Sequence, residues 1–183
     1  AAGQVPLTRL DADGYVGTAR KWLRGPRGTG WLAASPSAAT RLEPAHPSLV
    51  GRDAEGVGRL ATGEASVAAR VGLALALEEL AADADAVFAR VAALGAYARG
   101  RLDGVGGWRA QEPRDEPSGI VTLAHPVEDP VAVAGRLWDK GIATTAIPAS
   151  RAPDDLTCGV LRVSLHAYCE PEDLDRLEFS LRR

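Results

Sequence analysis

The chain contains no methionine, only two cysteines and only two lysines, whereas arginines are numerous. The cysteines, Cys158 and Cys169, do not show the spacing of a metal site, and their scarcity favours a reducing, cytoplasmic setting. No apolar run approaches the roughly 18 residues that a membrane-spanning helix needs, and no signal-peptide pattern opens the chain. We therefore expect neither a metal ion nor a membrane partner.

The charges are nearly balanced, with a net charge of −3, so the composition gives no reason to expect nucleic-acid binding. With 183 residues, 46% hydrophobic and 25% charged, the chain is ordinary for a globular protein and can bury a core in one or two small domains. Because methionine is absent even at position 1, either the N-terminus is processed or the chain is a piece of a longer one.

A lysine that precedes a glycine-rich turn is the most distinctive feature present. Residues 18–32 read TARKWLRGPRGTGWL, and Lys21 is followed by three glycines at positions 25, 28 and 30. Glycine permits backbone angles that other residues avoid, and Pro26 stiffens the same turn. The composition predicts that Lys21 lies on a segment of fixed shape. The alternative is a surface cluster of lysine and arginine before a glycine-rich turn.

This segment resembles the cofactor lysine segment of the class V aminotransferases, a family of fold-type-I pyridoxal phosphate (PLP) enzymes. The family pattern is Ser or Thr, a small residue, His or Arg, the reactive Lys, and then Gly-Pro-x-Gly-x-Gly. Thr18, Ala19, Arg20, Lys21 and residues 25–30 fill it in order. The resemblance implies that Lys21 forms a Schiff base with PLP and later acts as a base. It also implies that Thr18 and Arg20 bind the cofactor phosphate.

The same resemblance implies a division of the chain. Residues 1–7 look like the tail of a family segment whose Asp and Gln contact the cofactor ring, and both of these residues would lie upstream of Ala1. Family members run about twice this length, which favours a piece of a longer protein. We expect residues 1–83 to be the C-terminal remnant of the PLP-binding large domain and residues 84–183 to be a small C-terminal α/β domain. We expect the segment alone to be inactive.

Hydrophobic periodicity predicts the elements of the first part. Strands are expected over 13–17 and 31–34, on either side of the Lys21 turn, and an irregular loop over 35–58. A helical pattern covers 66–102, broken near 81–85. Its apolar positions are expected to be core; they are Val67, Val71, Leu73, Leu75, Leu77, Leu80, Val87, Val91, Leu94 and Tyr97.

The second part predicts a small α/β domain with a mostly antiparallel sheet. The family resemblance implies that the chain is the C-terminal part of a fold-type-I PLP-dependent transferase. Alternation of apolar and polar residues marks the strands, and Gly141 is a natural helix C-cap. The expected elements are strands over 108–111, 120–123, 142–147 and 160–165, a helix over 129–140 and a last helix from Glu170.

Residues 161–168 carry a second resemblance to the family. The usual family pattern at this place is Arg-hydrophobic-Ser-x-x-x-Tyr-Asn. Arg162 occupies the place of the family arginine that binds the substrate α-carboxylate, for which a guanidinium offers two parallel hydrogen bonds. The alternative is a structural ion pair with an acid of the last helix. His166 and Tyr168 are expected to support the end of the strand.

Gly63 and Glu64 occupy the place of a family Gly-Thr pair that reaches across a dimer to the neighbouring cofactor phosphate. A carboxylate would repel that phosphate. Glu64 therefore either engages a cationic substrate group or is an acid in the first turn of a helix, where the helix dipole stabilises it.

Cysteine desulfurases need a nucleophilic cysteine on the loop before the arginine, and residues 144–157 contain none. The resemblance therefore implies a PLP-dependent enzyme that acts on an amino acid, most closely a carbon–sulfur lyase like the hercynylcysteine sulfoxide lyases of ergothioneine biosynthesis. It also implies a homodimer. Alternatives are an isopenicillin epimerase-like or aminotransferase activity, and a non-catalytic fragment that dimerises or binds anions.

Overall fold

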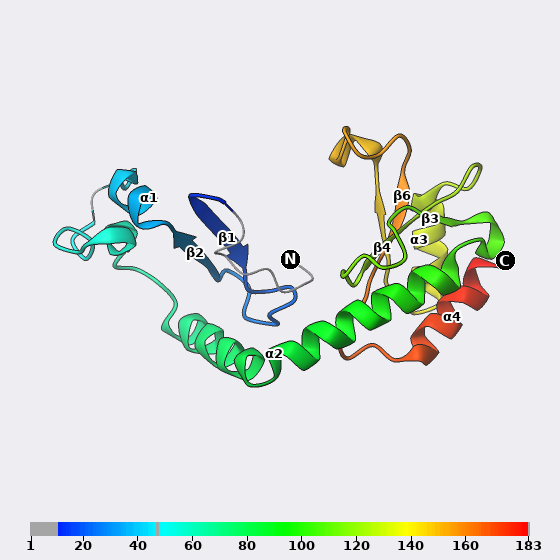
Figure 1. Ribbon diagram of the computed structural model, residues 1–183, viewed down its shortest axis with the longest axis horizontal. Coiled ribbons are helices and arrows are strands. Elements are labelled where there is room, and N and C mark those ends of the chain that lie inside the picture. The colour runs from blue at the N-terminus through cyan, green and yellow to red at the C-terminus, as the bar shows by residue number, and fades with distance from the viewer. Residues whose placement is uncertain (1–10, 47, 183) are drawn as a thin grey trace. The chain divides into compact units, whose positions relative to one another are not determined.

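The computed structural model describes residues 11–46 and 48–182 (Figure 1). They form two compact units, which we call the N-terminal unit (described residues 11–84) and the C-terminal unit (85–182). The division falls within helix α2, Val67–Leu102, next to a break in helical geometry at Asp83. The break predicted near residues 81–85 is confirmed. The motif tail expected at residues 1–7 lies outside the described residues.

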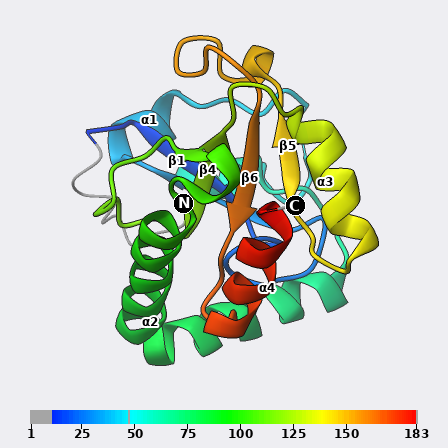
Figure 2. The ribbon, with the colours of Figure 1, turned by 90° about the vertical axis from the view of Figure 1, so that its right-hand side faces the viewer.

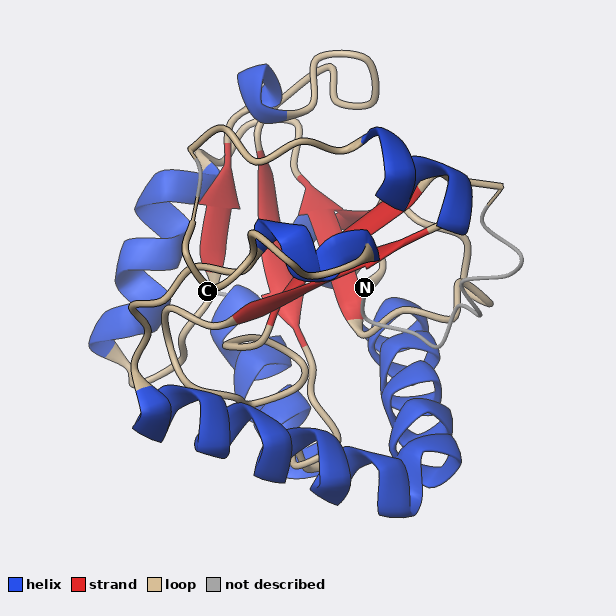
Figure 3. Ribbon diagram, turned by 90° about the vertical axis from the view of Figure 1, so that its left-hand side faces the viewer, coloured by secondary structure: helices blue, strands red, loops and turns tan. Residues whose placement is uncertain are grey.

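The N-terminal unit is built on a two-stranded antiparallel sheet of β1, Gly14–Thr18, and β2, Gly30–Ala34. The two strands lead into and out of the Lys21 turn (Figure 3). Tyr15 and Trp31 stack across the pair with their ring centroids 5.2 Å apart. Both strands predicted around Lys21 are therefore confirmed.

The irregular loop predicted over 35–58 is wrong in its first part, because helix α1 covers Pro36–Arg41. Ser35 caps this helix, since its Oγ accepts a hydrogen bond from the Ala38 amide at 3.1 Å. Serine at the N-cap and proline at the first helical position are both preferred at a helix start. The prediction treated the same residues as loop formers. A short 3-10 helix, Gly56–Leu60, follows.

The C-terminal unit has a four-stranded sheet in the order β3-β4-β6-β5, and every neighbouring pair is antiparallel. The predicted small α/β domain is therefore confirmed. Its strands are β3, Arg109–Ala110; β4, Ile120–Ala124; β5, Thr145–Ile147; and β6, Val160–Ser164. Its further helices are α3, Pro130–Asp139, and α4, Pro171–Leu181, with 3-10 helices at Val105–Gly107 and Ala149–Arg151. Gly141 follows α3 with a φ of 74°, as a residue after a helix C-cap often does.

The core of the C-terminal unit lies between one face of this sheet and the helices α2, α3 and α4 (Figure 2). Apolar side chains from all three helices and from β4 and β6 form one buried cluster. Its members include Leu94, Ala98, Leu102, Trp108, Val121, Leu123, Val133, Leu137, Leu161, Val163, Leu165, Leu174, Leu177 and Leu181. The other face of the sheet is mixed: it carries Arg162 with Thr122 and Thr145, and also apolar residues such as Val160, which is 1% exposed.

The expectation that all apolar positions of α2 are core is wrong for four positions in its first half and for Tyr97 in its second half, which is 43% exposed. Val67, Val71 and Leu75 recur every four residues, yet they are 73%, 54% and 59% exposed. Val91 and Leu94, in the second half, are buried. Periodicity identifies one face of a helix but does not say whether other residues cover that face.

Arg99 of α2 holds the segment that leads into β4. It is 1% exposed, and its guanidinium donates to the carbonyl oxygens of Arg114, Glu116, Ser118 and Ile120. Gly95, one turn earlier, allows the close approach, because a Cβ there would overlap the Ser118 carbonyl oxygen. These contacts fix the start of β4, the strand that lies beside β6.

No helix in the described ranges is both long and apolar enough to cross a membrane.

Candidate functional site

The Lys21 turn is tied to itself by backbone hydrogen bonds. The Ala19 amide donates to the Thr29 carbonyl at 3.1 Å, and the Gly25 amide donates to the Ala19 carbonyl at 2.9 Å. The Arg24 amide donates to the Lys21 carbonyl at 2.9 Å. Ala19 is fully buried while Lys21 is exposed, so the turn is anchored beside the lysine and presents the lysine side chain outward.

Close packing fixes the glycine-rich part of the turn. A Cβ on Gly25 would lie 2.8 Å from the Ala19 Cβ, and Gly28 has a φ of 82°, in the left-handed region that glycine adopts without strain. A Cβ on Gly72 would lie 2.7 Å from Pro26 Cγ, so the turn packs directly against α2. These contacts support the fixed shape that the composition predicts.

Three polar side chains project from this turn within four residues. Thr18, Arg20 and Lys21 are all exposed, and none forms a hydrogen bond or ion pair with a described residue. Nearby, Arg24 is instead engaged with Glu79 at 3.3 Å. A primary amine condenses with an aldehyde, and hydroxyl and guanidinium groups bind phosphate oxygens. The free donor set therefore fits a phosphorylated aldehyde.

Arg162 lies on β6 in the C-terminal unit, on the sheet face opposite the core. It is flanked by Thr122 of β4 and Thr145 of β5, its direct partners in the strand register. Its Nε is buried and has no hydrogen-bond partner among the described residues. An unpaired buried donor is costly unless a ligand or water completes it. Arg162 is thus suited to an anionic ligand.

The alternative role of Arg162, an ion pair with an acid of the last helix, is wrong within the described residues. No ion pair joins Arg162 to any described acid of α4, and two of these acids have other partners: Asp175 pairs with Arg101 at 2.8 Å, and Glu178 pairs with Arg101 and Arg182 at 2.5 Å each. The helix packs on the core face of the sheet, away from the Arg162 side chain.

Glu64 is not an acid in the first turn of a helix, which corrects one of the two expectations for it. Helix α2 begins at Val67, and Ser66 precedes it with its Oγ accepting from the Ala69 amide at 3.2 Å. Glu64 lies before this cap, is exposed, and forms no hydrogen bond or ion pair with any residue that the structure describes.

The two cysteines are in different settings. Cys158 is exposed, whereas Cys169 is partly buried and its Sγ accepts a hydrogen bond from the His166 amide at 3.4 Å. His166 and Tyr168 stack with their ring centroids 4.6 Å apart, just after β6. Over the described ranges there is no group of three or more His, Cys, Asp or Glu residues that suits a metal ion.

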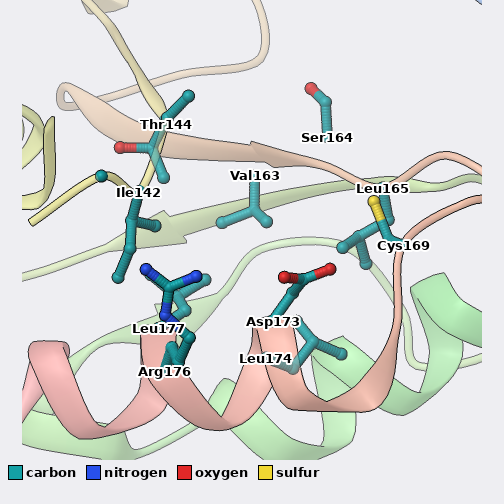
Figure 4. Close-up of a pocket in the computed structure, with 12 residues that line it drawn as sticks. Ile142, Thr144, Val163, Ser164, Leu165, Cys169, Asp173, Leu174, Arg176 and Leu177 are labelled. Atoms are coloured by element: carbon teal, nitrogen blue, oxygen red, sulfur yellow. The ribbon is translucent and has the colours of Figure 1, made fainter.

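A small hollow of about 170 Å³ lies on the other face of β6 from Arg162 (Figure 4). Val163 and Leu165 line it together with Asp173 and Arg176, which project from α4 toward the strand. The charged groups already have structural partners: Asp173 accepts from the Glu170 amide at 3.0 Å, and Arg176 donates to the Lys140 carbonyl at 3.4 Å. Because Val163 and Leu165 lie on the opposite face of β6 from Arg162, the hollow is separate from the Arg162 face.

Two residues beside Arg162 were not predicted from the sequence. Thr122 lies directly opposite Arg162, and Glu112 is hydrogen-bonded to Thr122. Only the register of β4 against β6 places them there, and no local motif marks either residue.

Comparison with known proteins agrees with the family resemblance. A profile of the class V aminotransferase family matches residues 2–177. A probable hercynylcysteine sulfoxide lyase from Mycobacterium tuberculosis is 45% identical over 171 residues, which make up 91% of this chain and 43% of that protein.

Solved structures share the fold. The cysteine desulfurase CsdA of Escherichia coli matches with a TM-score of 0.81 and 24% identity, over 95% of this chain and 46% of that chain. A C-DES variant with glycine covalently linked to the PLP cofactor matches with a TM-score of 0.85 and 18% identity, over 99% and 48%. The chain thus spans about half the length of the relatives it matches. The chain belongs to the class V aminotransferases, the family of PLP-dependent enzymes that its lysine segment resembles.

Proposed function

We propose that the chain is part of a PLP-dependent enzyme that acts on an amino acid, most closely a carbon–sulfur lyase. The observation that carries this proposal is the free Lys21 amine, which directly follows the free side chains of Thr18 and Arg20 on a tightly packed turn. The name of the 45% identical relative supports the same reaction class.

Each residue has a role that follows from its chemistry. Lys21 would hold PLP covalently through Nζ, and Thr18 and Arg20 would bind its phosphate with a hydroxyl and a guanidinium. Arg162 would bind the substrate carboxylate, which would complete its unpaired Nε. Bound PLP supplies an electron sink for the bonds at the substrate α-carbon. The Lys21 amine would also move the substrate α-proton at Nζ.

Sulfur chemistry without a protein thiol distinguishes the lyase from a desulfurase. Residues 144–157, which include β5 and most of the segment between β5 and β6, contain no cysteine, and a desulfurase of this family would need one there. A lyase instead releases sulfur directly from the substrate β-carbon once the α-proton has left. An epimerase or an aminotransferase would use the same Lys21 and Arg162, so product analysis separates these reactions.

The proposal extends to how the chain is organised. Residues 1–83 would be the end of the PLP-binding large domain and residues 84–183 the small domain of a cytoplasmic homodimer that acts on a small amino-acid substrate. A non-catalytic dimerisation or anion-binding fragment is the competing proposal. On either proposal, residues 1–183 alone would show little or no turnover.

Chemical trapping tests the central proposal. The protein is loaded with PLP, reduced with borohydride and digested, and the phosphopyridoxyl group is mapped by mass spectrometry. We expect the label on Lys21, with Lys140 as the internal comparison because it is the one other lysine. A Lys140→Arg variant should label normally and a Lys21→Arg variant should not. Labelling on Lys140, or none, would reject the assignment.

A second experiment separates the roles of Lys21 and Arg162. Arg162→Lys keeps the charge but loses the paired donors that match a carboxylate. We expect PLP attachment to Lys21 to stay normal while the affinity for amino-acid substrate falls about tenfold or more, the scale of a charged hydrogen bond. Unchanged substrate affinity would remove Arg162 from the site.

A further inference from the structure

Arg162 and Thr122 face one another across the β4–β6 pair at close range. The Thr122 amide donates to the Glu112 carboxylate, and the Thr122 carbonyl accepts from the Gln111 amide at 3.0 Å. Both backbone groups of Thr122 therefore bond on the β3 side and not toward β6. Opposed residues of this non-hydrogen-bonded kind have Cα atoms only about 4.5 Å apart, with their side chains close together.

The carboxylate of Glu112 is held at this same position. Its Oε1 accepts from Thr122 Oγ1 at 2.7 Å, and the Thr122 amide donates to Oε2 at 3.0 Å and to Oε1 at 3.1 Å. Glu112 is thus a negative charge fixed beside the direct partner of Arg162. Opposed Cβ atoms lie about 4.5–5.5 Å apart, so a group hydrogen-bonded to the Thr122 hydroxyl falls within the length of the Arg162 side chain.

Arg162 nevertheless forms no ion pair with Glu112 or with any other acid that the structure describes, and its Nε stays unpaired. A guanidinium beside a carboxylate normally forms a paired, charge-assisted hydrogen bond. Here the carboxylate is already engaged by a hydroxyl and an amide of one threonine. Thr145, on the other side of Arg162, also presents a hydroxyl and not an acid.

We propose that Thr122 is a positioning residue that holds the Glu112 carboxylate and so keeps the Arg162 guanidinium open for the carboxylate of the substrate. This inference rests on the role of Arg162 given under the proposed function. Loss of the Thr122 hydroxyl leaves Glu112 with the backbone amide alone. The carboxylate then turns to Arg162 and competes with any carboxylate ligand for the same donors.

Nuclear magnetic resonance of the Arg162 Nε–H group in the 183-residue chain tests this directly, with acetate as the probe and chloride at equal ionic strength as the control. We expect acetate to shift the wild-type signal. In Thr122→Val we expect the apparent affinity for acetate to fall at least fivefold and the exchange of this proton with water to slow. In the double variant Thr122→Val, Glu112→Gln we expect wild-type affinity to return, because the competing charge is gone.

Two further variants separate positioning from damage to the sheet. Thr122→Ser keeps the hydroxyl and should keep wild-type acetate affinity. Thr145→Val is the matched control, since it removes the hydroxyl on the other side of Arg162, where no carboxylate is held, and it should change nothing. If acetate moves the wild-type signal but Thr122→Val binds it equally well, or if the double variant fails to recover, the positioning role is wrong. If acetate leaves the wild-type signal unmoved, the substrate role of Arg162 also fails, while the Lys21 labelling result is unaffected.

Discussion

The two units of the chain bury very different amounts of apolar surface. In the C-terminal unit, side chains from three helices and two strands close over one cluster that contains Trp108, Leu123 and Leu161, all 0% exposed. In the described part of the N-terminal unit, the buried apolar residues are alanines, at positions 19, 38 and 39. Larger apolar side chains such as Val16 are 73% exposed there.

This difference shows two ways of placing a functional side chain. Arg162 is placed by a sheet whose far face is a packed core, so its position depends on residues far away in the sequence. Lys21 is placed by short-range backbone bonds and by glycines that allow close approach, with little core beneath it. The position of Arg162 should therefore resist single substitutions close to it in the sequence. The position of Lys21 depends on the residues of the turn itself.

The largest expected effect compares two leucines on the same helix, α2. Leu102 is 0% exposed and Leu75 is 59% exposed. Leu102→Ala should lower the free energy of unfolding by about 2–5 kcal/mol, through lost burial and a cavity. Leu75→Ala should change it by no more than about 0.5 kcal/mol. Urea denaturation followed by circular dichroism measures both. Equal destabilisation by the two substitutions would contradict the difference between the two halves of α2 and show that its first half is covered in solution.

A smaller effect is expected for two glycines of α2, one in each unit. In Gly95→Ala the new methyl group meets the backbone carbonyl of Ser118, which Arg99 holds in place. We expect a loss of about 1–3 kcal/mol in the free energy of unfolding. In Gly72→Ala the methyl meets the Pro26 ring, a milder overlap than that with the Ser118 carbonyl oxygen at Gly95. Thermal unfolding should show the smaller loss for Gly72→Ala, and the reverse order would contradict the view that the C-terminal unit is the more rigidly packed.

Acid should weaken the C-terminal unit through Glu178. Hydrogen bonds from Arg182 and then from Arg101 hold the pKa of the Glu178 carboxyl below its ordinary value of 4.5. A lowered folded-state pKa adds stability that is complete above the ordinary value and is lost as the pH falls through the lowered one. In Glu178→Gln the decrease in melting temperature below pH 4.5 should therefore be shallower than in wild type. Parallel melting curves for the two proteins would exclude this contribution.

The smallest effect is expected for the thiols, which lie only in the C-terminal unit. Replacing Cys158 and Cys169 together by serine should leave turnover of the enzyme within about twofold, because serine can still accept the bond from the His166 amide and neither thiol is assigned chemistry. Steady-state assays with PLP content and folding matched would measure it. A large loss of turnover would revive the desulfurase reaction.

Much of the architecture could be predicted because local signals and tertiary packing agree. The strands around Lys21, the alternation of Leu161, Arg162 and Val163, and the glycine after α3 were all visible in the sequence. Helix α1 was missed because Ser35 and Pro36 mark helix starts as well as loops. The exposed face of α2 was missed because periodicity does not report what covers a helix.

The site shows the same limit. The order of residues in a motif identifies Lys21 and Arg162 as candidates, and the packed turn and the unpaired Nε support them. The pairing of Thr122 with Arg162, and of Glu112 with Thr122, depends on which residues of two strands lie opposite. Register is decided by the whole sheet and its core, so no short stretch of sequence contains it.

Arg99 has a consequence for how the chain can vary. One guanidinium binds four carbonyl oxygens, three in the segment before β4 and one at Ile120, so the backbone of that segment is held largely by a residue of another element. Substitutions at the exposed positions Arg114 and Asp115 should therefore be tolerated, while Arg99, in a helix that ends before β3 begins, should accept almost none. The positions that can vary lie in the segment before β4, whereas Arg99, the residue that allows this variation, lies in α2. A mutant library confined to the segment would therefore not reveal that Arg99 is constrained.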